Sequence, residues 1–584
     1  MPVSKKTAKK TQKQKQPKVG KPVITKYKTF WHYHHVLRSI TGVFNLHQVV
    51  IKSKPLLELL QEITEDPTYY RDEPTKALSD IFCYINALED RKSPDSAELV
   101  TFLNAHFADI RKQLANLLAD GLISFDLLWY LFKKGDDVSF QSDGVMQGGR
   151  VISCDYRETW TGRVFTLKVS IIKSDGRKFY QSVQAFNVPQ FNSVKKQEQL
   201  PVSVLTVKNR AQLTERGRIY REIANQATYR EYSSHLLWKE WFGTQMYKAN
   251  GRCMIDQVSF HRQNPEYRDR DTEVEDLEGI PDEMLFSCNA WIMGFSFATK
   301  RWGEFSLDHL SQVEFKDNAF DTLVLKPSTK HMVRALVEHA GSTFQDIIYG
   351  KGGGCIFLLH GPPGTGKTLT AESLAEVLHR PLYSCSVGEL GTTPEKLEVS
   401  LRNILEMATL WNAVILIDEA DIFLESRTDD ADIDRNAMVA IFLRLLEYHQ
   451  GVLFLTTNRV RSFDRAFHSR ISVAIEYPAL SISERKQVWN NLLGAAMIDI
   501  EKYNLDINSL AQHDVNGRQI KTSIRLAQAL AKADNNGVLT MELLEEPLIH
   551  AAEFLETVEQ QNNVEDVKEV RPRVGKRTKL VGAL

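Results

Sequence analysis

The sequence has few cysteines and no long apolar run, the features that a structural metal site and a membrane span need. Its 584 residues include 6 cysteines, which lie far apart and without C-x-x-C spacing. This spacing argues against a zinc site and favours reduced thiols in a cytoplasmic or nuclear protein. No apolar run approaches the length of about 20 residues that crosses a bilayer, so we expect no membrane span. The short apolar runs, such as Ile356–Leu359, predict buried strands instead.

Acidic residues are missing from the start of the chain. Residues 1–28 carry ten lysines and no acid, and self-repulsion predicts a disordered basic tail. The tail has neither the apolar centre of a signal peptide nor the arginines of a mitochondrial presequence. Three interpretations stay open: a solvated tail, an attachment to nucleic acid such as ribosomal RNA, or a nuclear-import signal shared with Arg571–Lys579. We predict a second basic tail over residues 561–584.

The first half of the chain predicts two regions and contains no internal repeat. Residues 29–135 are predicted to be helical, because apolar residues recur at three-to-four spacing between Pro55 and Leu131. Residues 136–318 predict an α+β region. In that region Asp175-Gly176 marks a β-hairpin after an alternating run, residues 206–250 read as helix, residues 263–283 as an exposed loop, and Phe286–Phe297 and Arg301–Leu307 as strands.

The second half alternates strands with helices. Apolar strands are predicted at residues 356–360, 382–386, 413–417 and 452–456, with helices beginning near Lys367, Pro394 and Asn436. Fully apolar strands separated by helices indicate a parallel sheet covered on both faces. We therefore predict an α/β core over residues 319–480, followed by a small helical unit over residues 481–560.

One loop in this core has the pattern of a phosphate-binding loop, G-x-x-x-x-G-K-[ST]. Glycines let successive backbone N–H groups point at phosphates, and the next helix adds its positive dipole end. Lys367 is expected to reach the β- and γ-phosphates of ATP, and the Thr368 hydroxyl to ligate Mg²⁺. The loop residues are Gly361, Pro362, Pro363, Gly364, Thr365, Gly366, Lys367 and Thr368.

A second set of polar residues follows the strand at 413–417. Asp418 and Glu419 stand where a parallel strand ends and opens onto a ligand. Asp418 is expected to hold Mg²⁺ and Glu419 to orient the attacking water, since phosphoryl transfer depends mostly on positioning and charge. Asp421 is predicted to cap a helix or to support these groups.

From about Phe320 onward the chain resembles the AAA+ ATPase superfamily, through G-P-P-G-T-G-K-T, I-D-E-A-D and T-T-N-R. The resemblance implies a P-loop parallel sheet with a C-terminal helical lid. It also implies a sensor role for Asn458 and an arginine-finger role for Arg470. For Arg518 two interpretations stay open, a contact to the γ-phosphate or an ordinary arginine at a helix start. Asp346 and Ile347 resemble the adenine-contacting segment of the family.

The resemblance narrows to fungal-type AAA proteins that carry an N-terminal domain of uncertain function. The segments that carry it are Gly121–Trp129, Asn250–Asp256 and Gly294–Phe297, together with Trp302 and Phe320-Asp321. It implies a domain layout and no particular substrate.

Two metal-like patterns lead to no metal prediction. His32, His34 and His35 have no Cys or acid at ligand spacing, so we predict a solvated or packed aromatic segment. Residues 430–441 begin like an EF-hand loop but have Arg435 and Ile441 where the loop needs Gly and Glu.

These patterns and the resemblance predict a Mg-dependent ATPase that forms a homo-oligomer, with a hexamer expected, and does conformational work on a protein or nucleoprotein client. The alternative is a nucleotide-gated scaffold that hydrolyses little ATP. The loop at residues 387–393 has no aromatic residue, so threading of a polypeptide and pushing by domain motion stay open.

Overall fold

The structure is a computed structural model in which the chain forms two compact units, Met1–Gln312 and Val313–Leu584. It describes residues 18–19, 23–39, 42–64, 67–70, 74–82, 84–91, 93–160, 162–240, 243–267, 272–338, 354–424, 433–459, 465–534, 538–551 and 553. The predicted basic tail at 561–584 lies outside these residues. The finer division into six segments stays a prediction. No described helix has the length and apolar character needed to cross a membrane.

The first unit begins with a sheet where the sequence predicted a tail and helices. The strands are β1 (Lys18–Val19), β2 (Val23–Lys26), β3 (Phe30–Ser39), β4 (Gly42–Ile51) and β5 (Thr75–Ala77), with β2 and β4 paired to β3. The helical prediction is therefore wrong over residues 30–39, 42–51 and 75–77, and the tail prediction is wrong for residues 18–19 and 23–26. Phe30 pairs with Ile51, and both are buried; burial at alternate positions next to aromatic and β-branched residues favours strands.

Helices follow this sheet, as the apolar spacing predicted. They are α1 (Lys54–Thr64), α2 (Leu78–Phe82), α3 (Ile85–Asp90), α4 (Pro94–His106), α5 (Ala108–Ala119) and α6 (Leu128–Leu131), with 3₁₀ turns η1 (Pro67–Tyr70) and η2 (Phe125–Leu127). A short strand, β6 (Leu122–Ser124), pairs with β11 (Val194–Lys196). Leu56, Leu60, Leu99 and Leu103 share one core with the first sheet and the next one.

The second sheet has the strand order β12-β7-β8-β9-β10-β17. Its members are β7 (Asp137–Ser142), β8 (Val145–Thr159), β9 (Gly162–Ser174), β10 (Phe179–Pro189), β12 (Val202–Val204) and β17 (Thr272–Leu277). The predicted hairpin at Asp175-Gly176 is confirmed: the Asp175 carboxylate accepts the N–H groups of Arg177 and Lys178 at 2.8 and 2.9 Å. The loop predicted at 263–283 is wrong for residues 272–277, because β17 pairs with the edge strand β10.

The third sheet contains β13 (Thr228–Tyr232), β14 (His235–Glu240), β15 (Gly243–Lys248), β16 (Gly251–Ile255), β18 (Trp291–Ser296), β19 (Arg301–Ser306) and β20 (Leu310–Ser311). The helix predicted over 206–250 ends early, since α7 covers Val207–Ile223 and three strands follow. Aromatic and β-branched residues at Thr228–Tyr232 favour pairing over helix. The strand predicted over 286–297 is confirmed for residues 291–296 only, because residues 286–287 belong to a 3₁₀ turn, and the strand predicted over 301–307 is confirmed for residues 301–306. The remaining elements are α8 (Gln257–Gln263), η3 (Gln197–Gln199), η4 (Asp282–Ser287) and η5 (Leu307–His309).

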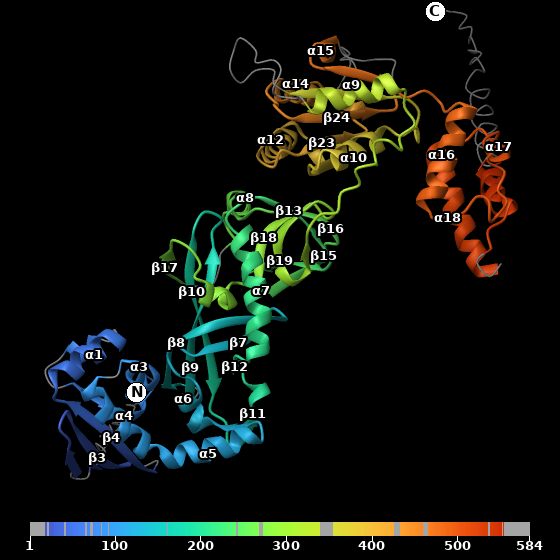
Figure 1. Cartoon of the computed structure of the whole chain (residues 1–584). Coiled ribbons are helices and arrows are strands. Elements are labelled where there is room, and N and C mark those ends of the chain that lie inside the picture. The colour runs from blue at the N-terminus through green and yellow to red at the C-terminus, as the bar shows by residue number, and fades with distance from the viewer. Residues whose placement is uncertain are drawn as a thin grey trace, which may run out of the picture. The chain divides into compact units, whose positions relative to one another are not determined.

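The second unit is built on a parallel sheet, as predicted, and its strand order is β22-β23-β24-β21-β25. Figure 1 labels two of these strands, β23 and β24. The strands are β21 (Cys355–His360), β22 (Leu382–Ser386), β23 (Val414–Asp418), β24 (Val452–Thr457) and β25 (Val473–Glu476). The accompanying helices are α9 (Pro327–Glu338), α10 (Lys367–Val377), α11 (Val387–Leu390), α12 (Pro394–Leu410), α13 (Asp421–Leu424), α14 (Ile433–Glu447) and α15 (Arg465–His468). Helices α9 and α10 pack on one face of the sheet, and Ile415 and Leu453 on the opposite face are also fully buried.

The predicted helical lid follows β25 and has its own core. It contains α16 (Ile482–Ala495), α17 (Ile507–Leu510) and α18 (Gly517–Asp534). Trp489 and Leu493 from α16 pack with Ile520 and Ile524 from α18. The apolar spacing along both helices accounts for this pairing.

Candidate functional site: a phosphate loop at the edge of the parallel sheet

The loop between β21 and α10 has a backbone that only glycine permits at its two tightest positions. Gly361 has φ +144°, and a Cβ there would lie 2.0 Å from the Tyr477 carbonyl oxygen. Gly364 has φ +77°, and a Cβ there would lie 2.5 Å from Oδ1 of Asn516. Glycine at these two positions therefore lets the loop pass close to Tyr477 and Asn516 in a backbone path of the kind that phosphate-binding loops adopt.

Lys367 stands at the first position of α10 and is 7% exposed. Its ammonium donates to the carbonyl oxygens of Gly361 and Pro362 at 2.8 and 2.7 Å, and to Oδ1 of Asn458 at 2.9 Å. Burial lowers the pKa of Lys367, an effect that Asp418 and Asp421 oppose and that the positive charge of Arg518 strengthens.

Asp418 ends β23 and lies between two hydroxyl groups. Thr368 Oγ1 is 3.4 and 3.3 Å from the two Asp418 oxygens, and Thr456 Oγ1 donates a short hydrogen bond to Asp418. A hydroxyl beside a carboxylate is the oxygen donor set that Mg²⁺ takes together with phosphate oxygens. The two residues predicted as metal ligands therefore fit a Mg-nucleotide.

Glu419 is exposed, next to Asp418, in a backbone conformation that is uncommon for residues other than glycine. Its φ is +56°, and its N–H donates to Thr456 Oγ1 at 3.0 Å. A left-handed backbone conformation in such a residue costs free energy and persists only where surrounding contacts hold it in place. Such conformations are frequent at functional sites. Asp421 accepts a hydrogen bond from Thr457 Oγ1, in line with the supporting role predicted for it.

The strand order brings these groups together. Strand β24 lies between β21 and β23, so Asn458, just after β24, meets Lys367 after β21. Thr456, near the end of β24, meets Asp418 at the end of β23. Sequence reasoning missed Thr456, although its place at the end of an apolar strand was a usable signal.

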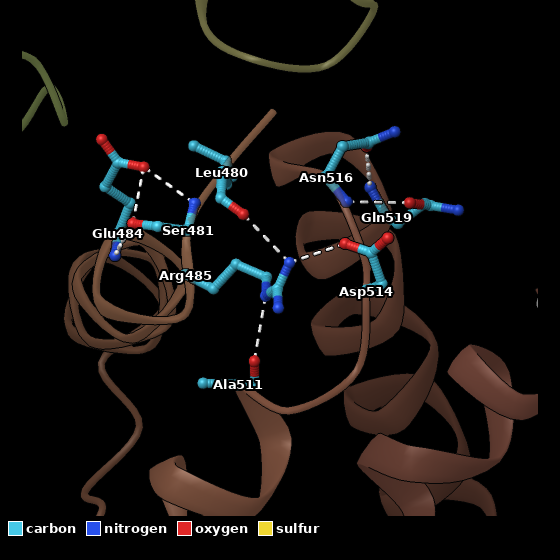
Figure 2. A network of polar contacts seen from close by, with 8 residues as sticks. All are labelled: Leu480, Ser481, Glu484, Arg485, Ala511, Asp514, Asn516 and Gln519. Atoms are coloured by element: carbon cyan, nitrogen blue, oxygen red, sulfur yellow. Dashed lines mark hydrogen bonds and ion pairs between the residues drawn. The ribbon is translucent and has the colours of Figure 1, made fainter. Parts of the chain in front are cut away.

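The lid contacts the phosphate loop through the start of α18. The Gly517 N–H donates to the Gly364 carbonyl at 3.0 Å. Asn516 and Gln519 exchange backbone-to-side-chain hydrogen bonds of 2.9 and 3.0 Å, which cap the helix (Figure 2). Sequence reasoning also missed Asn516, although Asn followed by Gln three residues later is a capping pattern.

Arg485 on α16 holds the segment that leads to this contact. Figure 2 shows its guanidinium reaching three oxygens: the carbonyls of Leu480 at 3.0 Å and Ala511 at 2.9 Å, and Asp514 Oδ1 at 2.7 Å. The side chain is buried, so these bonds fix the turn before Asn516 to the first helix of the lid.

The other residues predicted for the site are not joined to this cluster by the contacts above. Arg470 follows α15 and donates to Glu447 Oε2 at 3.0 Å, at the end of α14. Arg518 lies in the first turn of α18, near enough to Lys367 to affect its pKa. Asp346 and Ile347 lie outside the described residues. Within the loop, Thr365 Oγ1 donates to the Pro362 carbonyl at 2.9 Å.

The first unit contains a cavity of about 870 Å³ that the sequence did not indicate. Lys239 lies in its wall, where its ammonium is 2.8 Å from Glu304 and 3.1 Å from Asp143. Burial disfavours this ammonium, but Glu304 and Asp143 outweigh burial and raise its pKa. Tyr267 donates a short hydrogen bond to Glu304.

The parallel sheet, phosphate loop and lid define a P-loop nucleotide-binding domain. Residues 357–479 match the model of the ATPase family associated with various cellular activities (AAA), and residues 113–207 match a domain of unknown function (DUF7025). The chain therefore carries an AAA+ ATPase domain with a separate N-terminal domain of unknown function.

Curated relatives agree with this assignment. ATPase family AAA domain-containing protein 3 of Bos taurus is 27% identical over 250 residues, which are 39% of this chain and 42% of the relative. The human protein 3B is 28% identical over 250 residues, 39% of this chain and 38% of the relative. A 26S proteasome regulatory subunit homolog of Methanothermobacter marburgensis is 30% identical over 186 residues, 30% of this chain and 49% of the relative. The chain spans less than half the length of each.

Proposed function

We propose that this protein binds Mg-ATP and hydrolyses it to ADP and phosphate, as a homo-oligomer that remodels a macromolecular client. The observation that carries the proposal is the meeting of side chains from three adjacent strand ends. Lys367 lies 2.9 Å from Asn458, and Thr368 lies 3.3 Å from Asp418. The AAA match suggests an oligomer; the hexamer, the client and the contact of the basic tail with nucleic acid are proposals.

The phosphate loop and the neighbouring strand ends have different roles in binding Mg-ATP. Backbone N–H groups of Gly364, Thr365 and Gly366 and the Lys367 ammonium hold the phosphates, since Pro362 and Pro363 have no N–H to donate. Thr368 and Asp418 would hold Mg²⁺, which would neutralise charge on the phosphate oxygens. On binding, the Lys367 ammonium exchanges its bonds to the Gly361 and Pro362 carbonyls for phosphate oxygens. Asn458, beside Lys367, then orients the γ-phosphate or the attacking water.

Glu419 is the residue that acts on the attacking water. Its carboxylate is exposed while its backbone is fixed by Thr456, so it orients and polarises water next to Asp418. The bond between Gly517 and Gly364 links the lid to the same loop. Phosphates held by the loop therefore influence the lid, which is the route by which hydrolysis becomes movement.

The test compares Glu419→Gln with the wild type in ATP binding and phosphate release. We expect unchanged nucleotide affinity and a loss of turnover of about 10²- to 10⁴-fold, the usual contribution of a positioned acid–base group. Glu406→Gln, at an exposed position on α12, is the matched control and should hydrolyse ATP normally. Full turnover in Glu419→Gln, or a wild type that binds ATP without releasing phosphate, would refute the proposal and favour the scaffold.

A further inference from the structure

The positive charge at the start of the chain extends well beyond the tail. Residues 1–57 contain 13 lysines and arginines, and the first acidic residue of the chain is Glu58. With the total at -1, the remaining residues have a net charge of -14. The five strands β1 to β5 lie in or next to this segment and contain no Asp or Glu. Lysines and arginine with no acid among them give this segment a positive charge that attracts a polyanion.

The two faces of this sheet differ. One face, with Phe30, Val49 and Ile51, belongs to the apolar core. Strand residues alternate between faces, and Trp31 pairs with Val50 on one side and with Lys26 on the other. Trp31 and Tyr33 therefore lie on the face opposite the core. Both are half-buried, and Lys26 at the edge of this face is exposed.

Two lysines lie at the Trp31 ring. The ammonium of Lys52 is 4.0 Å from the ring centroid, and that of Lys26 is 4.9 Å from it. Cation–π contacts at partly exposed sites contribute about 0.5–1 kcal/mol each. An anion that binds the ammonium groups more strongly than the ring does can therefore displace the ring. Lysine side chains are flexible point charges and can move from the ring to a phosphate.

We infer that this face of the first sheet, centred on Trp31 with Lys26 and Lys52, binds single-stranded nucleic acid. The two lysines leave the indole ring to pair with phosphates, and an unpaired base stacks on the ring in their place. Proteins that bind single strands without sequence preference combine phosphate pairing and base stacking in this way. Bases in a duplex are already stacked and cannot reach the ring. Trp31 lies on β3, between β2 and β4, so its ring lies on the sheet face, which suits a base better than insertion into a membrane.

The test measures binding of a short fluorescent, unstructured RNA to the full chain by anisotropy at several salt concentrations, without ATP. Trp31→Ala should weaken binding by about 5- to 150-fold, the range for loss of one stacked base, and Trp31→Phe should retain most of the affinity. Lys26→Gln with Lys52→Gln should reduce the slope of log affinity against log salt by about 1.4. The matched control neutralises the exposed lysines Lys112 and Lys208 and should change the slope less.

Three outcomes would overturn the inference. The first is wild-type binding by both Trp31→Ala and the Lys26/Lys52 double variant. The second is equal affinity for the RNA and for a duplex of the same sequence. The third is binding to phosphatidylserine vesicles with none to the RNA. The lysine variant removes no core packing, so it decides the question even if Trp31→Ala unfolds. Binding is measured without nucleotide and is thus independent of the proposed ATPase activity.

Discussion

The two units of this protein place their polar chemistry differently. In the AAA+ unit, Lys367, Asp418, Glu419 and Asn458 stand at the ends of parallel strands or just beyond them. In the N-terminal unit, polar and titratable groups lie on sheet faces and within the interior, as Lys239, Glu304 and the histidines of β3 and β4 do. Parallel strands gather their carboxyl ends at one edge, whereas antiparallel strands send alternate side chains to opposite faces.

This contrast explains why the site of the AAA+ unit can be predicted from the sequence, whereas the charged network of the N-terminal unit cannot. Residues that follow neighbouring parallel strands come together at one edge of the sheet, regardless of the loops that separate the strands in sequence. A motif and its spacing therefore suffice to predict a site. Charged residues on antiparallel strands meet only partners that register and sheet packing select. The pairing of Lys239 with Glu304, which are 65 residues apart, has no sequence signature.

The largest expected effect sharpens the view that the AAA+ site is completed by a second subunit. Arg470→Ala should retain ATP binding and lose about 10³–10⁵ in turnover, as arginine fingers supplied from outside a site do. Lys367→Ala should be inactive because it no longer binds ATP, but it still has an intact Arg470. Mixing the two variants and measuring phosphate release should recover part of the activity, because some intact fingers then face intact pockets.

Recovery should follow the mixing ratio and the protein concentration. Activity that stays at zero in mixed oligomers that are shown to form would contradict a role of Arg470 toward its neighbour. Arg470 would then act within its own chain, through contacts such as the one with Glu447.

A smaller effect is expected from the charged network in the N-terminal unit. Glu304→Gln leaves Lys239 with Asp143 as its only charged partner in that network, and loss of one member of a largely buried pair should cost about 2–3 kcal/mol of unfolding free energy. Glu215→Gln breaks an exposed pair with Arg218 and should cost less than about 1 kcal/mol. Thermal unfolding of the full chain measures both. Equal costs for the two substitutions would mean that burial adds nothing at Glu304.

The smallest effect concerns two histidines, one in each unit. The pKa of His47 is lowered to about 4 by burial, then by His106, His34 and His32 around it. The pKa of His449 is lowered to about 4 by burial alone. Both pKa values lie below the unfolded value near 6.5, so both rings favour the folded state above that pH. The stability they contribute is lost as the pH falls from about 6.5 to 4.

Unfolding curves at neutral and mildly acidic pH should show this loss, about 1 kcal/mol for the partly solvated His47 and somewhat more for His449. His47→Gln and His449→Gln should each remove part of it. Added salt should soften only the His47 contribution, because screening weakens repulsion between neighbouring imidazoles and leaves desolvation unchanged. A pH dependence that neither substitution alters would contradict the assignment.

The sequence by itself determined the parallel sheet, the lid and the phosphate loop. Apolar strands and the glycines of residues 361–366 admit few alternatives, since each glycine conformation there excludes other residues. It also determined which carboxylates follow β23. The hairpin of β3 and β4 was mispredicted as helix together with the helical spacing that begins at Pro55. The burial that favours these two strands comes only from their pairing and from α4.

Tertiary structure alone decided the contacts that cross between segments. The bonds from Thr456 to Asp418 and from Gly517 to Gly364 depend on strand order and lid docking. Four histidines from β3, β4 and α4 come together, with His32 Nε2 3.1 Å from His47 Nδ1, although spacing along the chain predicted only a packed or solvated segment. The physical reason is the same in each case: local sequence sets backbone preference, whereas side chains distant in sequence meet only after the whole chain has paid the entropy of closing the loops between them.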